Sequence, residues 1–92
     1  MLLRREPGSN YSWQRISNSL VYVYDGKVLI NIIDNFGVSL PLYTMKVLNK
    51  KGLVVCLVMG DDAIKLQEQA FEKLSELKIK HHRVIETKEE ML

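Results

Sequence analysis

The run Leu53-Val54-Val55-Cys56-Leu57-Val58-Met59 contains no polar side chain. Its β-branched residues favour a strand, and Gly60 breaks the pattern at its end. Successive side chains of a strand point to opposite faces of a sheet, so this run is apolar on both faces. We therefore expect a central strand that needs cover on each side.

Two turn motifs upstream predict two β-hairpins. Asp25-Gly26 separates an apolar run that begins at Leu20 from another over Lys27–Ile33, and this pair suits a type I′ turn because both central positions need positive φ. Asn49-Lys50-Lys51-Gly52 suits a type I turn that closes through a glycine bulge.

The strand that precedes the second turn is expected from about Val38 to Leu48. Pro41 has no amide hydrogen, so its end of the strand should lie at an edge or an irregular point. From Tyr43 onward apolar and polar side chains alternate, which is typical of a half-buried strand. Tyr43, Met45 and Val47 share the expected buried face.

A helix is expected after Gly60. Asp61 and Asp62 can accept hydrogen bonds from the first-turn amides, and both suit the positive end of the helix dipole. An apolar stripe at a spacing of three and four follows, made of Ala63, Leu66, Ala70, Leu74 and Leu77 and widened by Ile64 and Phe71. The pattern ends near Leu77 or Lys78.

The predicted fold class is α+β, with an antiparallel sheet of two β-hairpins, one long amphipathic helix and a short C-terminal strand at Val84-Ile85. At 92 residues the chain suits one domain, expected over residues 18–88. Residues 1–17 carry Pro7, Gly8 and few bulky apolar groups, so we expect an irregular arm there. Residues 89–92 should form a frayed tail.

One helix covers only one face of a sheet, so the apolar strands predict self-association. The uncovered face would expose more apolar surface than monomers usually tolerate, and a sheet from a second subunit is the simplest cover. We expect a homo-oligomer, either a dimer or a tetramer. Its interface is expected at Tyr22, Tyr24, Ile32, Val54, Cys56 and Val58, or at the opposite set of the apolar run, with Leu57 at its centre.

Basic residues gather after the expected helix, at Lys78, Lys80, His81, His82 and Arg83. They complement the negative end of the helix dipole, and they are also candidate contacts for an anion or a nucleic acid, with Lys50 and Lys51 joining them if the fold allows. The formal net charge of +2 is too small to indicate a nucleic-acid binder by itself.

No motif indicates catalysis. The sequence has no phosphate-binding glycine loop and no nucleophile motif, and two adjacent histidines do not chelate one ion readily. We expect no cofactor and no metal site; helix capping is the simpler role for Asp61 and Asp62, although a small enzyme with these carboxylates between subunits is a third hypothesis. Cys56 is the only cysteine and suits a buried thiol in a reducing cytoplasm. No apolar run is long enough for a membrane-spanning helix or a signal peptide.

One stretch resembles a known family. Val38-Ser39-Leu40-Pro41, a strand over Met45–Leu48, and Lys51-Gly52-Leu53-Val54-Val55-Cys56 follow Asp25-Gly26-Lys27. This order is similar to the YunC-like family, domain-of-unknown-function family 1805, over about a third of the chain. Leu57 stands where that family has glycine, and the helix after Gly60 is longer. The resemblance implies tetramer formation through an N-terminal β region, and no known activity.

Overall fold

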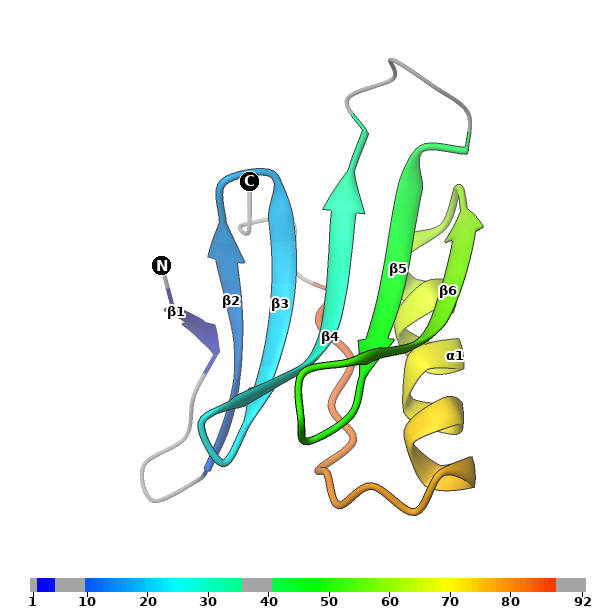
Figure 1. Ribbon diagram of the computed structural model, residues 1–92. Helices are drawn as coiled ribbons and strands as arrows, with labels where there is room; N and C mark the ends of the chain where they lie inside the picture. Colours follow the sequence, from blue (N-terminus) through cyan, green and yellow to red (C-terminus); the bar gives the residue numbers. More distant parts are fainter. Residues whose placement is uncertain (1, 5–9, 36–40, 88–92) are drawn as a thin grey trace.

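The computed structural model describes residues 2–4, 10–35 and 41–87. They form one antiparallel sheet in which the six strands follow the order of the sequence. The elements are β1 (Leu2–Arg4), β2 (Tyr11–Ile16), β3 (Ser19–Tyr24), β4 (Lys27–Asp34), β5 (Tyr43–Leu48), β6 (Val54–Gly60) and α1 (Ala63–Glu76). Figure 1 shows α1 and the segment that follows it behind the sheet. We call this covered side the inner face and the opposite side the outer face. The predicted α+β class is confirmed.

Both predicted hairpin turns are present. Asp25 and Gly26 have φ values of 53° and 76°, and Tyr24 pairs with Lys27, as a two-residue type I′ turn requires. In the second turn Gly52 has a φ of 83° and its amide donates to the Asn49 carbonyl. The Asn49 side chain also accepts hydrogen bonds from the amides of residues 51 and 53, which fixes the turn from within.

The predicted irregular arm is wrong over Tyr11–Ile16, because these residues form β2 and pair with β3 along its whole length. Tyr11 and Trp13 are buried on the inner face, and Trp13 packs against Tyr22 and Phe71. The aromatic residues therefore supply the burial that makes this segment a strand despite its polar neighbours. Residues 5–9 of the expected arm lie outside the described part of the chain.

The predicted helix is confirmed in its start and its end, and its apolar stripe is confirmed in the middle; Ile64 and Leu77, at the two ends of the predicted stripe, are exposed. The Asp62 carboxylate accepts from the amides of Ile64 and Lys65, so it caps the first turn. Lys78 follows the C-cap with a φ of 59°, which ends the helix. The apolar residues of α1 that are buried in the core are Leu66, Ala70, Phe71 and Leu74.

The apolar run that we expected in the centre of the sheet forms β6, which is an edge strand. Its one neighbour is β5, where Met45 pairs with Val58 and Val47 pairs with Cys56. Cys56 and Val58 pack against the core under α1, whereas the alternate residues point to the outer face. One helix therefore covers one face of this strand, and within residues 2–4, 10–35 and 41–87 no segment pairs with its other edge.

The C-terminal segment, residues 77–87, is the second cover of the inner face. It crosses behind the sheet in Figure 1 and is tied down by side chains from the core. Trp13 Nε1 donates to the Val84 carbonyl at 2.7 Å, and the Tyr22 hydroxyl donates to the His82 carbonyl at 2.6 Å. The predicted strand at Val84-Ile85 does not form, because this segment bonds to side chains across the face and pairs with no strand edge.

A buried glutamine joins α1 to this segment. Gln67 is 1% exposed; its Nε2 donates to the Glu86 carbonyl at 2.9 Å and its Oε1 accepts from the Glu86 amide at 2.7 Å. The side-chain amide thus pairs with a backbone peptide group as another strand would. This pairing gives the buried side-chain amide a donor and an acceptor partner, which offsets the cost of removing it from water.

We expect Gln67→Leu to lower the free energy of unfolding by about 2 kcal/mol or more, because both hydrogen bonds to the Glu86 backbone are lost in a buried site. Urea denaturation followed by circular dichroism measures the change. Gln69→Leu is the matched control, since Gln69 is an exposed glutamine of the same helix. Equal stability of the Gln67→Leu variant and the native chain would show that this pairing does not hold the segment.

Candidate functional surfaces

The six residues expected at an interface are divided between the core and the surface. Tyr22, Tyr24 and Ile32 are buried in the core of this chain. Their side chains are covered by other residues of the same chain. This corrects the expectation of an interface at these three residues, because they do not form an exposed surface. Cys56 and Val58 are half-buried against the same core, and Val54 is exposed.

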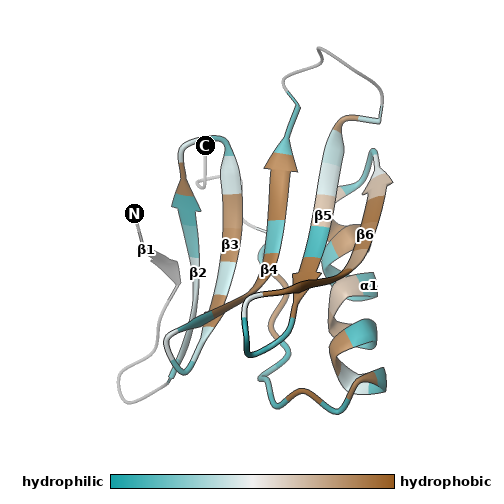
Figure 2. Cartoon of the chain, viewed as in Figure 1, coloured by the Kyte–Doolittle hydropathy of each residue, from teal (hydrophilic) through white to brown (hydrophobic). Residues whose placement is uncertain are grey.

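The exposed apolar residues lie instead along β6 and in the turn that precedes it. They are Leu53, Val54, Val55, Leu57 and Met59, with exposed fractions between 40% and 61%. Figure 2 shows the unbroken hydrophobic colour along β6 at the edge of the sheet. We call these five residues the β6 surface. The sequence left two alternative interface sets open in this strand. The structure exposes the alternative centred on Leu57.

The outer face next to β6 is mixed in character. Leu57 pairs with Lys46 and Met59 pairs with Thr44 across the β5–β6 ladder, and Asn31 of β4 pairs with the same Lys46. A row of polar side chains thus separates the β6 surface from the centre of the outer face. The apolar surface is a strip along the edge and does not extend across the sheet.

The basic group after the helix does not form one surface. His82 stacks on Tyr11 with ring centroids 4.3 Å apart, and His81 stacks on Phe71 at 5.6 Å. Both rings pack the C-terminal segment onto the body, and the His81 Nδ1 lies 2.7 Å from the Ile79 carbonyl. The two histidines therefore have a structural role in this fold.

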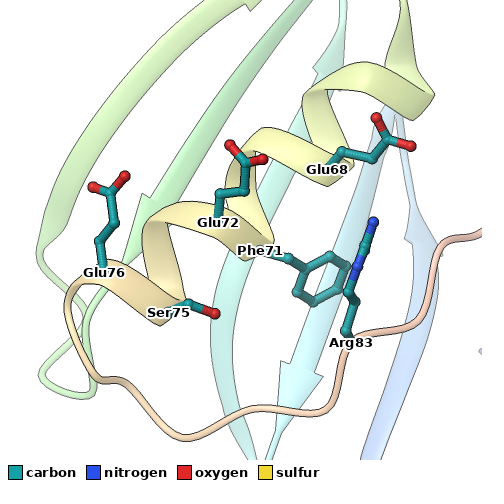
Figure 3. A pocket seen from close by; sticks show the side chains of 6 residues that line it. All are labelled: Glu68, Phe71, Glu72, Ser75, Glu76 and Arg83. Carbon is teal, nitrogen blue, oxygen red and sulfur yellow. The ribbon is translucent and has the colours of Figure 1, made fainter.

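Arg83 faces carboxylates. Figure 3 shows it across an open groove from Glu68, Glu72 and Glu76, which lie in a row along α1. The groove has a volume of about 380 Å³, and Phe71 forms its floor. The acidic row offsets the charge of the guanidinium, so Arg83 does not extend a cationic surface.

Lys80 lies at a different place, in a pocket at the end of the sheet that carries the two hairpin turns. Lys27 follows the first turn and Lys50 lies in the second, and both line this pocket with Lys80. The sequence left open whether the fold brings Lys50 near the basic group; the structure places Lys50 beside Lys80 alone among those residues, together with Lys27, which was not anticipated. The signal was present in the sequence, because alternate turns of an antiparallel meander lie at the same end of the sheet.

Asp61 and Asp62 are both occupied by backbone amides. Asp62 caps α1, and the Asp61 Oδ1 accepts from the Leu42 amide at 2.9 Å, which ties the start of β5 to the helix entrance. Among the residues that the structure describes, no three metal-binding side chains gather. In the same residues no helix has the length and apolar character needed to cross a membrane.

Comparisons with family models, with curated proteins and with solved structures gave no match for this chain. The resemblance to the YunC-like family therefore remains a prediction from the residues alone.

The Tyr22 hydroxyl has a perturbed acidity with a clear cause. Burial in the aromatic core disfavours the phenolate and raises the pKa of Tyr22 to about 12, although the hydrogen bond with the His82 backbone partly opposes the shift. The ordinary value is 10.0. The folded chain therefore keeps this phenol neutral at a pH where an unfolded chain would ionise it.

We expect the stability due to Tyr22 to be complete below pH 10 and to be lost as the pH rises towards 12. Urea denaturation across this range should show a steady fall in the free energy of unfolding. Tyr22→Phe should be less stable at neutral pH by about 1–3 kcal/mol, because it lacks the hydrogen bonds to His82, and should lose less stability in alkali. A Tyr43→Phe variant, which keeps Tyr22, should retain the alkaline loss. An identical alkaline profile in Tyr22→Phe and the native chain would contradict this assignment.

Proposed function

We propose that this chain is a non-catalytic assembly module that forms homo-oligomers through β6. The observation that carries the proposal is an edge strand with exposed apolar side chains and neither a charge nor a proline between Leu53 and Met59. An edge strand presents unpaired backbone groups, and monomeric proteins usually protect such edges with charges, prolines or bulges within the strand. The residues of β6 lack the charges and prolines, and its register with β5 shifts only at its start, between Val54 and Cys56.

The occupant best suited to this edge is a second copy of the same strand. Antiparallel pairing of two identical strands about a two-fold axis makes each residue contact its symmetry mate, so one surface can serve both subunits. With the axis at Leu57, Leu57 lies opposite Leu57 of the partner subunit, and Val55 lies opposite the partner's Met59. The β6 residues of the two copies then become cross-strand neighbours along the shared edge and contact one another laterally.

This arrangement differs from the face-to-face packing of two sheets that the sequence favours. Packing on the outer face beside β6 would bury Lys46 and Thr44 without a partner, which is costly for an ammonium group. Edge pairing leaves both at the surface and satisfies the free backbone groups of β6. α1 lies behind β5 and β6 in Figure 1, so the two helices would also approach one another on the inner face. The YunC-like resemblance implies a tetramer, which needs a second interface.

Nucleic-acid binding through residues 78–83 has less support. The two histidines pack against aromatic rings, Arg83 faces the acidic row of α1, and Lys80 lies in a pocket apart from them. A backbone-binding surface needs cations along a continuous track. We place the module in the cytoplasm, because the lone Cys56 thiol is half-buried and suits a reducing compartment.

We expect the native chain to migrate with at least twice its mass of 10.7 kDa in size-exclusion chromatography with light scattering at micromolar concentrations. Leu57→Lys should yield the monomer, since it places two like charges opposite each other at the axis. Ile16→Lys is the matched control, because Ile16 is 50% exposed and lies at the end of β2, far from β6 in the sheet order. The proposal fails if the native chain is a monomer, or if both variants dissociate alike.

A further inference from the structure

The pocket between the two hairpin turns and the C-terminal segment brings together three lysines from distant parts of the chain. Lys27 begins β4, Lys50 lies in the β5–β6 turn and Lys80 lies in the C-terminal segment. Figure 1 shows both turns and the start of this segment at the same end of the molecule. The pocket has a volume of about 100 Å³. We call it the lysine pocket.

The charge of the lysine pocket is not balanced by ion pairs. Within the described residues, no carboxylate lies within ion-pair distance of any of the three ammonium groups. Asp25 also lines the pocket, but its Oδ1 accepts a hydrogen bond from Asn10 Nδ2 at 2.6 Å, which directs that oxygen to the neighbouring strand. The lining therefore carries three positive charges and one negative charge. Three like charges in one recess repel each other, and a bound anion would relieve that repulsion.

The walls of the pocket strengthen this attraction. Tyr24 and Leu29 complete the lining, and both are buried. Apolar walls exclude water on one side, and electrostatic interactions are less screened there than on an open surface. Both residues belong to the packed core of the sheet and so give the pocket a buried floor. A mobile surface cluster of lysines would lack this buried floor.

The size of the pocket selects among anions. Its volume is about that of three molecules of liquid water, at about 30 Å³ each. One tetrahedral oxyanion fits this space, and any organic group attached to the oxyanion has to lie outside the pocket. A nucleic-acid backbone is also disfavoured, because the remaining basic residues of the C-terminal segment do not continue the pocket as a track.

We infer that the lysine pocket binds one phosphate group, either inorganic phosphate or the phosphomonoester of a small molecule. The dianion contacts the ammonium groups of Lys27, Lys50 and Lys80, each of which donates charge-assisted hydrogen bonds. The organic part of a phosphomonoester extends out of the pocket into solvent. This site is independent of the β6 surface, so neither proposal depends on the other.

The test is a titration of the full chain with inorganic phosphate and, separately, with glycerol phosphate, at low ionic strength. Amide chemical shifts and calorimetry report the binding. We expect saturable binding of both probes, with shifts at the amides of Tyr24, Leu29 and Lys80. Tighter binding of glycerol phosphate would identify a phosphomonoester as the ligand, and tighter binding of inorganic phosphate would identify the free anion.

Two double variants, each of which removes two positive charges, distinguish binding in the pocket from attraction by the net charge of the chain. Lys50→Ala/Lys80→Ala removes two lysines of the pocket and should weaken phosphate binding by about tenfold or more. Lys51→Ala/Lys65→Ala removes two exposed lysines that do not line it, and should bind phosphate as the native chain does. All four side chains are exposed, so both variants should keep the native circular dichroism.

Three results would overturn the inference. The first is the absence of saturable phosphate binding by the native chain. The second is an equal loss of binding in the two double variants, which would indicate attraction by net charge alone. The third is binding of a single-stranded oligonucleotide much more tightly than either phosphate probe, with both double variants weakened alike, which would assign the lysines to a nucleic-acid surface.

Discussion

The hydrogen bonds between the Tyr22 hydroxyl and the His82 backbone hold the C-terminal segment on the inner face of the sheet, and the closure of the core depends on that segment. α1 packs mainly on β4, β5 and β6 and reaches β2 and β3 through Phe71, so the C-terminal segment covers the rest of their inner face. That segment has no regular structure of its own, so its position comes from Tyr22, Trp13 and Gln67. Without these contacts the aromatic core would lie open to water. α1 alone is too small to cover a sheet of six strands. The C-terminal segment covers the part of the inner face that α1 does not reach.

Local patterns in the sequence predicted much of the fold. The Asp25-Gly26 turn, the glycine bulge at Gly52 and the Asp62 cap depend on neighbouring residues, so the sequence carries them directly. The strand Tyr11–Ile16 was missed because its polar residues mask the alternation of two buried aromatic residues. The pairing of Gln67 with Glu86 spans 19 residues, and a glutamine on a helix gives no sign of it. Long-range contacts of this kind have no local signature.

The β6 surface and the basic residues also depend on long-range contacts that the sequence does not reveal. The apolar run of β6 indicated self-association, but the sequence did not show that the strand lies at an edge, which decides the geometry of any partner. The basic residues after α1 are neighbours in the chain, yet the fold directs them to different places, because His81 and His82 each stack on a different aromatic residue. Lys27 and Lys80 are 53 positions apart in the sequence, yet both line the lysine pocket. Closeness in the sequence was thus a poor guide to closeness in space.

The meander has a consequence for the order in which the protein is made and folded. Each strand pairs with its neighbour in the sequence, so the sheet can grow by short loop closures as the chain leaves the ribosome. The contacts that seal the aromatic core join residues 60 and 71 positions apart, and the second partner of each is synthesised after all six strands and α1. Until the C-terminal segment is made, Trp13 and Tyr22 lack its cover, and α1 alone of the elements made after the sheet contacts them, through Phe71. Until this segment emerges, the partly folded chain exposes apolar surface of the kind that promotes aggregation.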